Sequence, residues 1–440
     1  MKDIVKVAFS HNCILKRVSK HALEIIRILL LMVTLANLLH AQTGAVTYVH
    51  DPCIIKSGNY YYVFSTGDRI EMRRAQNLQY WSRLDQAFQS IPEWGVQEVP
   101  GVSNIWAPDI FYRDSTYYLY YSLSTFGSTI SRIGLAINTT LDPRSPEYQW
   151  IDQGKVIESN TENNYNAIDP NVAEDEVGRL WLSFGSFWSG IKLIELDTTT
   201  MKPYPNTPIH SIASRSGVGA VEAPYIIFKN GYYYLFVSFD FCCQGVNSTY
   251  KTMVGRSSVI TGPYRDKYNV LMTAGGGHVV IEGDERWRGT GHCAVLLDGD
   301  ENWLVHHAYD AQANGVPTLR IEKLIWDEEN WPVIDNTSRV GDEAQSRIFH
   351  DYTLFQNYPN PFNIQTMISF TVPDAADVRI NIYNVNGRLV NELANAKYQP
   401  GIHKLLFDGS SLTSGVYFVQ SIMQAVGKRE VFTKKIMLMK

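Results

Sequence analysis

The chain has 440 residues, of which 45% are hydrophobic and 19% are charged, so it is long enough for two or three domains and is not disordered as a whole. Its aromatic content of 12% is typical of strand-rich proteins and of surfaces that stack flat ligands. The formal net charge of −5 is uneven, with +4 over residues 1–41, −12 over 42–349 and +3 over 350–440. Such an acidic central body argues against nucleic acid as a partner.

Residues 1–41 predict a signal peptide. Several Lys and Arg residues precede the apolar run 28–39, and Leu39-His40-Ala41 offers a cleavage site before Gln42. The run is too short to cross a bilayer as an ordinary helix, and an amphipathic helix packed on the body is the alternative. Export is therefore expected, into a compartment that permits disulfides.

A short motif recurs through the middle of the chain. It consists of a proline followed by strand formers, at Pro52, Pro108, Pro170 and Pro224, and a fifth copy around Cys293 lacks the proline. Successive copies are 56, 62, 54 and 69 residues apart. After each copy come a turn and a second apolar or aromatic strand, which ends at Ser65, Ser122, Phe184, Ser238 and His307 in turn.

This repeat predicts an all-β fold, a five-bladed β-propeller over residues 42–335 with roughly 59 residues per blade. A β-sandwich with coincidental motifs is the alternative. Proline fits as the first residue of an innermost strand, where no ladder donor is lost. The residues just before these strands would then surround one pocket, namely Asp51, Trp106, Asp169, Glu222 and His292.

A different composition follows. Residues 336–353 predict a linker, and 354–440 predict a small β-sandwich domain. Its expected strands are 367–372, 378–383, 404–407 and 416–421, separated by turn signals such as Asn386-Gly387.

Three acidic residues among the five suit glycoside hydrolysis. Inversion needs one carboxylic acid to protonate the leaving oxygen and one carboxylate to activate water, about 6.5–9.5 Å apart. A third carboxyl group near the acid helps to keep it protonated. Asp51, Asp169 and Glu222 could supply this set, although they could also cap turns or bind a structural cation.

The segments around these residues resemble glycoside hydrolase family 43. The motifs are Tyr48 to Pro52, Trp106 to Ile110, Asn166 to Val172 and Val221 to Tyr225, and the likeness spans about residues 46–334. It is strongest to the endo-acting arabinan 1,5-α-L-arabinanases. The resemblance implies that Asp51 is the general base, Glu222 the general acid, and Asp169 the residue that raises the pKa of the acid and orients it.

Further roles come from the same resemblance. It implies that Trp106 and Phe126 stack furanose rings and that Asn166, Ser186 and Trp188 contact sugar. His50, beside the base, would orient the substrate or be a buried structural histidine. His292 would coordinate a calcium or similar ion near the axis, with water completing the shell, and no organic cofactor is implied.

The cysteines allow few inferences. Cys53 and Cys293 fall on the first and fifth inner strands, so they are expected to be close or bonded when the ring closes. Pairs similar to Cys242-Cys243 occur in arabinanases. Because neighbouring cysteines bond only with strain, free buried thiols are expected for all four.

The C-terminal segment resembles type IX secretion sorting domains of Bacteroidota. The likeness rests on residues 356–363, 382–388, 414–417 and 434–440, and Ile364 stands where that family commonly has proline. It implies translocation across the outer membrane and surface attachment or release, often with removal of this domain. A sugar-binding module is the alternative, but the segment has few aromatic residues for stacking.

The sequence therefore predicts a monomeric enzyme, secreted or attached to the cell surface, that hydrolyses arabinan from within the chain. The alternatives are an exo-acting arabinanase, an α-L-arabinofuranosidase, a β-xylosidase, or a propeller that binds glycans without cleaving them. Retaining fructan-cleaving propellers are disfavoured, because His50 precedes Asp51 and Ala223 follows Glu222 where that family has other residues.

Overall fold

The computed structural model describes residues 42–335 except 218, and residues 352–440 except 355–356, 358–359, 373–374, 399–400 and 426–427. The expected signal peptide and residues 336–351 of the expected linker lie outside the described residues. The chain divides into two compact units, with the boundary in the sequence after residue 338. Among the described residues, no helix has the length and apolar character needed to cross a membrane.

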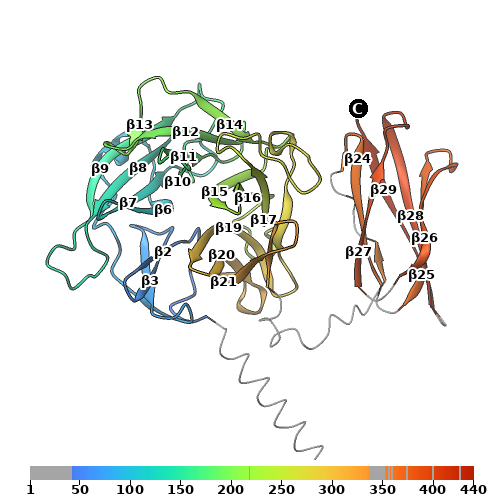
Figure 1. The fold of residues 1–440 in the computed structure, drawn as a ribbon, viewed down its shortest axis with the longest axis horizontal. Coiled ribbons are helices and arrows are strands. Elements are labelled where there is room, and N and C mark those ends of the chain that lie inside the picture. Colours follow the sequence, from blue (N-terminus) through green and yellow to red (C-terminus); the bar gives the residue numbers. More distant parts are fainter. Residues whose placement is uncertain are drawn as a thin grey trace, which may run out of the picture. The chain divides into compact units, whose positions relative to one another are not determined.

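Within residues 42–335 the described strands form five separate sheets (Figure 1). The first sheet contains β2 (Cys53–Ser57), β3 (Tyr60–Ser65), β4 (Glu71–Ala75), β5 (Tyr80–Arg83) and β1 (Thr43–Gly44). The second contains β6 (Trp106–Arg113), β7 (Thr116–Leu123), β8 (Ser131–Asn138) and β9 (Ile151–Ser159). The third contains β10 (Asn171–Glu174), β11 (Leu180–Phe184), β12 (Ile191–Asp197), β13 (Lys202–Pro203) and β14 (Ile209–Ala213).

The fourth sheet contains β15 (Val221–Lys229), β16 (Tyr232–Phe239), β17 (Lys251–Ser257) and β18 (His278–Glu282). The fifth contains β19 (Trp287–Asp298), β20 (Glu301–Asp310), β21 (Val316–Trp326) and β22 (Pro332–Ile334). Short helical segments are confined to connections, at α2 (Glu93–Glu98), η1 (Gly245–Asn247), η2 (Met272–Ala274) and η3 (Ala311–Ala313).

The first strand of each sheet lies next to the first strand of the following sheet. Contacts join β2 to β6, β6 to β10, β10 to β15, β15 to β19, and β19 to β2 (Figure 1). Apolar clusters fill the spaces between neighbouring sheets. One cluster joins the second and third sheets, another the third and fourth, another the fourth and fifth, and the largest joins the fifth, first and second.

The N-terminal segment of the described chain connects the first sheet to the fifth. Thr43 pairs in parallel with Tyr80 of β5, and Thr47 bridges Thr318 of β21. The fully buried Arg73 donates from Nε to the carbonyl of Ala45 at 2.8 Å. This short segment thus connects two sheets that are far apart in sequence.

The prolines of the repeat do not all begin a strand. Pro52 and Pro170 directly precede β2 and β10, as expected, but Pro108 and Pro224 lie inside β6 and β15. Both interior prolines sit where the strand register shifts. A bulge leaves one residue outside the ladder, so a residue without an N–H group is accommodated there.

The second unit has two sheets around one core. One sheet contains β23 (Thr353–Leu354), β24 (Gln365–Val372) and β27 (Gly401–Asp408). The other contains β26 (Leu389–Tyr398), β25 (Ala376–Asn384), β28 (Gly415–Ala425) and β29 (Lys428–Leu438). Apolar residues of both sheets pack together, among them Ile368 and Phe370 of β24 and Ile380 and Val419 of the other sheet.

The expected strands of this unit are present but longer than expected, and three further strands, β23, β26 and β29, were missed. β26 and β29 were not expected because their exposed faces carry many polar residues, which weaken the alternating pattern of a strand. Thr353, assigned to the linker, already pairs with Thr371 in β24.

Buried Asp109 of β6 connects the second and third sheets. Its Oδ2 atom accepts hydrogen bonds from Val172 N at 2.8 Å and Asn171 Nδ2 at 3.3 Å. Burial raises its pKa to about 7 in spite of these donors. Because an unfolded aspartate titrates near 3.9, the folded state binds more protons between about pH 4 and 7, and this group costs stability as the pH rises through that range.

An Asp109→Asn variant should lose less stability than wild type between pH 4 and 8, because an amide imitates the protonated acid. The difference in unfolding free energy should change by up to ~4 kcal/mol across the range. Urea unfolding of residues 42–440 at several pH values measures it. Asp114→Asn, at an exposed site, is the control and should follow wild type. Parallel curves for the Asp109 variant and wild type would contradict the assignment.

Candidate active site

The backbone just before or within each first strand has the same unusual conformation. One residue of each sheet has a left-handed φ: Asp51 (52°), Ala107 (41°), Asp169 (57°), Ala223 (55°) and His292 (50°). Side chains other than glycine adopt this region at a cost of about 1–3 kcal/mol, so surrounding contacts must hold it in place.

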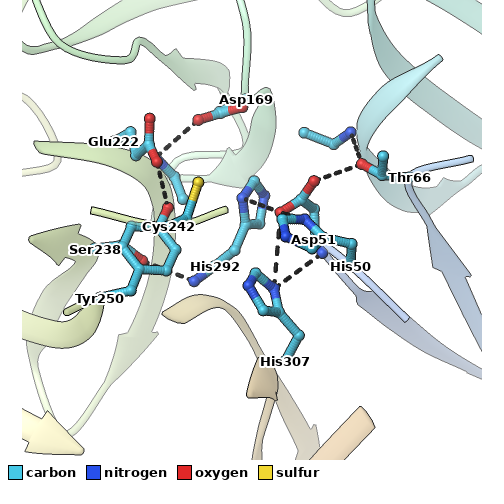
Figure 2. A network of polar contacts seen from close by, with 12 residues as sticks. His50, Asp51, Thr66, Asp169, Glu222, Ser238, Cys242, Tyr250, His292 and His307 are labelled. Carbon is cyan, nitrogen blue, oxygen red and sulfur yellow. Dashed lines mark hydrogen bonds and ion pairs between the residues drawn. The ribbon is translucent and has the colours of Figure 1, made fainter. Parts of the chain in front are cut away.

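Hydrogen bonds from these five residues supply such contacts. Each donates its backbone N–H to a side chain that precedes it around the unit: Asp51 to His307 Nδ1 (3.1 Å), Ala107 to Thr66 Oγ1 (2.8 Å), Asp169 to Ser122 Oγ (3.0 Å), Ala223 to Asp169 Oδ2 (3.1 Å) and His292 to Ser238 Oγ (2.7 Å). The five turns are thereby joined to one another. Side chains from distant parts of the sequence converge on one space, shown in Figure 2.

Asp51 is surrounded by hydrogen-bond donors (Figure 2). Its Oδ1 atom lies 2.8 Å from His50 Nδ1 and 3.1 Å from His292 Nδ1, and Thr66 Oγ1 donates to its Oδ2 at 2.5 Å. Burial alone would raise the pKa of Asp51, but the attraction and hydrogen bonds of His50 and His292 hold the pKa well below its ordinary value. The group is therefore a carboxylate at neutral pH.

Glu222 of β15 has the opposite tendency. Burial raises its pKa, Ser186 and Tyr250 lower it through hydrogen bonds, and the charge of Asp51 raises it further. Ser186 Oγ bonds its Oε2 at 2.6 Å, and the Tyr250 hydroxyl bonds its Oε1 at 2.7 Å. Both carboxyl oxygens are thus held in place by hydroxyl groups.

Asp169 is buried near Glu222. Burial raises the pKa of Asp169 to about 8, with repulsion from Glu222 and Asp51 adding to the shift and His292 opposing it. Two carboxyl groups that repel each other in a buried site resist joint ionisation. We therefore expect Asp169 and Glu222 to retain one proton between them at neutral pH.

His292 carries the positive charge of the site. Burial lowers its pKa, but Asp51 above all, with Asp169 and Glu222, raises it to about 9. A separate group of possible metal ligands consists of His50, Asp51 and His307, whose ligand atoms all lie within 4.8 Å of one another. This structure therefore brings a His/Asp cluster together beside His292, the residue that the sequence analysis assigned to a metal.

The expected sugar-contacting residues differ in their surroundings. Ser186 bonds Glu222 directly, and His50 bonds Asp51. Asn166 is buried and accepts a hydrogen bond from Ser131 Oγ at 2.6 Å.

The three expected aromatic contacts are partly or largely exposed. Trp106 precedes Ala107, whose N–H bonds Thr66, and Trp188 is 43% exposed in the loop after Ser186. Phe126 is 87% exposed.

The prediction of four free thiols is wrong for one pair. Cys242 and Cys243 form a disulfide, whereas Cys53 and Cys293 are free and buried. The pair lies in the loop after β16, where Cys243 is exposed and has a φ of 66°, a loop conformation that leaves the two sulfurs able to meet.

Several residues at the site were missed from the sequence. Thr66, Ser122, Ser238 and His307 stand at or just after the ends of second strands and receive the N–H groups of the next turn. The signal was present, because four of the five second strands in the repeat end in Ser or His. Tyr250 and Tyr309 had no such signal, since tyrosine is common throughout these strands.

Carboxyl groups with opposed pKa shifts, gathered in one space and accompanied by exposed aromatic rings, define an acid–base hydrolase. Comparison with known proteins gives the family. Residues 46–332 match the glycosyl hydrolases of family 43, and residues 356–439 match a secretion system C-terminal sorting domain. The first match covers more than half of the chain, and the chain belongs to glycosyl hydrolase family 43. Its sorting domain makes it an extracellular protein.

The names of relatives of this chain describe two modes of action, exo and endo. The extracellular exo-α-(1→5)-L-arabinofuranosidase ArbA of Cellvibrio japonicus is 42% identical over 299 residues, 65% of this chain and 86% of that protein. The extracellular endo-α-(1→5)-L-arabinanase 1 of Bacillus subtilis is 46% identical over 290 residues, 64% of this chain and 87% of that protein. A Cellvibrio cellulosa α-L-arabinanase in complex with arabinohexaose is 40% identical, with a TM-score of 0.65 over 67% of this chain and 97% of that one.

Proposed function

We propose that this protein hydrolyses the α-1,5-L-arabinofuranosidic bonds of arabinan, acting within the chain and with inversion of configuration. The relatives at 42% and 46% identity act on α-1,5-linked arabinose polymers according to their names. The observation that carries the proposal is the opposed titration of Asp51 and Glu222, one held ionised and the other held toward its protonated form.

The proposed mechanism uses these two groups in one displacement. Asp51 takes a proton from water as that water attacks the anomeric carbon, and Glu222 gives its proton to the departing glycosidic oxygen. Asp169 and Glu222 resist joint ionisation, so a proton is retained between them, and Asp169 also accepts the backbone N–H of Ala223 at 3.1 Å. His50 orients the base, and Ser186 orients the acid.

Aromatic residues would bind the polysaccharide. The exposed rings of Phe126 and Trp188, together with Trp106 and with Asn166 below the surface, would contact successive sugars. Endo action would need a cleft that accepts the middle of a chain, and the exposed rings of Phe126 and Trp188 are suited to binding sugars along it. An exo-acting arabinanase, an α-L-arabinofuranosidase or a β-xylosidase is the second candidate, favoured by the exo-acting relative.

We further propose that the five sheets close into a five-bladed β-propeller over residues 42–335. The contacts of β19 with β2 and the bond from Asp51 N to His307 Nδ1 support closure, as does the N-terminal strand between the first and fifth sheets. The other proposed parts are a signal peptide at 1–41, a linker at 336–353 and a β-sandwich sorting domain at 354–440. The protein would act as a monomer and reach the surface through the secretion machinery that reads its C-terminal domain.

A calcium or similar ion near the axis belongs to the proposal. The three carboxyl groups around His292 create the negative potential that a divalent cation requires. His292 would hold the ion as a neutral imidazole, its proton displaced and its charge replaced by that of the ion, with water as the remaining ligands because calcium prefers oxygen. When bound, the ion would supply positive charge that favours the ionised form of Asp51.

Product analysis on debranched arabinan tests the activity. Residues 42–335 should release a ladder of short oligosaccharides, and Glu222→Gln should reduce the rate by at least ~100-fold, because the leaving oxygen is then not protonated. Release of arabinose or one short product would favour the exo-acting alternative. Binding of glycan without cleavage of arabinan, arabinoxylan or xylo-oligosaccharides would contradict an enzyme.

The pH dependence of kcat/KM tests the role of Asp169. Asp169→Asn removes one of the two carboxyl groups that resist joint ionisation, so Glu222 should lose its proton more easily and the alkaline limb should move to lower pH by about one unit. Ser186→Ala should move this limb to higher pH, because it removes a hydrogen bond that lowers the same pKa. If both variants shift the limb in the same direction, the assignment of Glu222 as the acid is wrong.

Removal of divalent ions tests the cation. Dialysis against a chelator should lower activity and thermal stability, and added Ca²⁺ should restore both. Elemental analysis should find about one equivalent of metal in wild type and much less in His292→Ala. Full activity in metal-free protein would rule out a functional ion.

A further inference from the structure

Tyr309, at the end of β20, contacts the base side of the site without touching any carboxyl group. Its hydroxyl lies 2.6 Å from His50 Nε2 and 2.8 Å from the backbone nitrogen of Cys243. The side chain is buried, and nothing in the proposed mechanism uses it. It therefore connects two parts of the molecule, the general base and the loop that contains the disulfide.

The hydrogen-bond donors fix the direction of this chain of contacts. The N–H of Cys243 donates to the Tyr309 oxygen, and the ionised carboxylate of Asp51 can only accept, so His50 donates from Nδ1 to Asp51. In the neutral ring, Nε2 is then the acceptor of the phenolic hydrogen of Tyr309. His50 then carries its ring hydrogen on Nδ1 and donates it to Asp51 Oδ1 at 2.8 Å. One tautomer of His50 is selected, and one oxygen of the base is held by it.

The loop at the other end of this chain is constrained covalently. The disulfide joins successive residues, Cys242 and Cys243, and therefore restricts the backbone whose N–H bonds Tyr309. The next residue, Gln244, donates its N–H to Ser248 Oγ at 3.0 Å. Cys243 Sγ also lies 3.9 Å from His50 Nε2, so the loop packs directly against the histidine.

Hydrogen bonds that run from Cys243 through Tyr309 and His50 therefore hold one oxygen of Asp51. We propose that the Cys242–Cys243 loop and Tyr309 position the general base Asp51 through His50. This inference rests on the proposed function, in which Asp51 activates water. Tyr309 and the loop are positioning elements, because they act through His50 rather than on substrate.

Two tyrosines provide a matched pair of variants. Tyr309→Phe removes a hydroxyl from the base side, and Tyr250→Phe removes one from the acid side, where the Tyr250 hydroxyl bonds Glu222 Oε1 at 2.7 Å. The two substrates are debranched arabinan and a 4-nitrophenyl α-1,5-arabino-oligosaccharide. The nitrophenyl leaving group needs little protonation, so a defect in the acid is hidden on this substrate and a defect in the base is not.

We expect Tyr309→Phe to lower kcat by about 10-fold on both substrates while KM stays within twofold of wild type. Tyr250→Phe should lower kcat on arabinan and leave the nitrophenyl substrate nearly unaffected. The thermal midpoints of both variants should be reported beside these rates, because a merely structural role would change stability without this difference between substrates.

A second set of variants tests the loop without altering a buried residue. The double variant Cys242→Ser with Cys243→Ser should lower kcat on both substrates, as Tyr309→Phe does. Combining all three substitutions should cause no further loss, because they interrupt the same chain of contacts. Thiol titration of unfolded wild-type residues 42–440 should count two thiols before reduction and four after it, which confirms the starting disulfide.

Three results would overturn the inference. These are a Tyr309→Phe variant whose loss disappears on the nitrophenyl substrate, a loss confined to KM, or losses from the loop and tyrosine variants that multiply. If Tyr309→Phe does not fold, full activity of the serine double variant still overturns it. Failure of wild type to cleave either substrate would instead refute the proposed function, and the positioning role with it.

Discussion

The site depends on one electrostatic constraint, the placement of three carboxyl groups around a single imidazolium in a buried space. His292 attracts all three, and the carboxyl groups repel one another. Ionising all of them would be costly, so the site settles with one group firmly ionised and a proton retained between the other two. Hydrogen bonds decide which group is ionised, because Asp51 receives donors from two histidines and Thr66, whereas Glu222 receives only neutral hydroxyls.

Backbone geometry delivers these groups to the same place. Asp51, Asp169 and His292 are themselves the left-handed residues, whereas Glu222 directly precedes the left-handed Ala223, and all four side chains reach the site. The N–H of each left-handed residue bonds the preceding turn or sheet. Each turn thus depends on its neighbour for the contact that stabilises an unfavourable φ. The positions of Asp51 and Asp169 are consequently set by the packing of whole sheets. A change in the packing of one sheet should therefore shift the turn that bonds to it in the next sheet.

The second strands supply the residues that support this arrangement. Thr66 and His307 contact the base from these strands, and Tyr250, which directly precedes β17, contacts the acid. Hydroxyl and imidazole groups suit these positions because they can accept a backbone N–H and still donate or stack elsewhere. His307, for example, accepts from Asp51 N while its ring stacks on that of His50 at 4.0 Å.

The sequence by itself determined the all-β character of the chain, the five repeats and the choice of three carboxyl groups as candidates. Those features are local, because a proline before apolar residues marks a strand and an acidic residue beside it marks a turn wherever the chain later goes. Tertiary structure alone decided which residues support the carboxyl groups. Tyr309 bonds His50 across 259 positions of sequence, and Tyr250 bonds Glu222 from the residue just before β17. No local sequence pattern predicts these contacts. The disulfide was likewise misjudged, because whether adjacent cysteines can bond depends on loop conformation. The pKa of each carboxyl group also required the fold, since burial and neighbouring charge set it and neither is visible in one segment of chain.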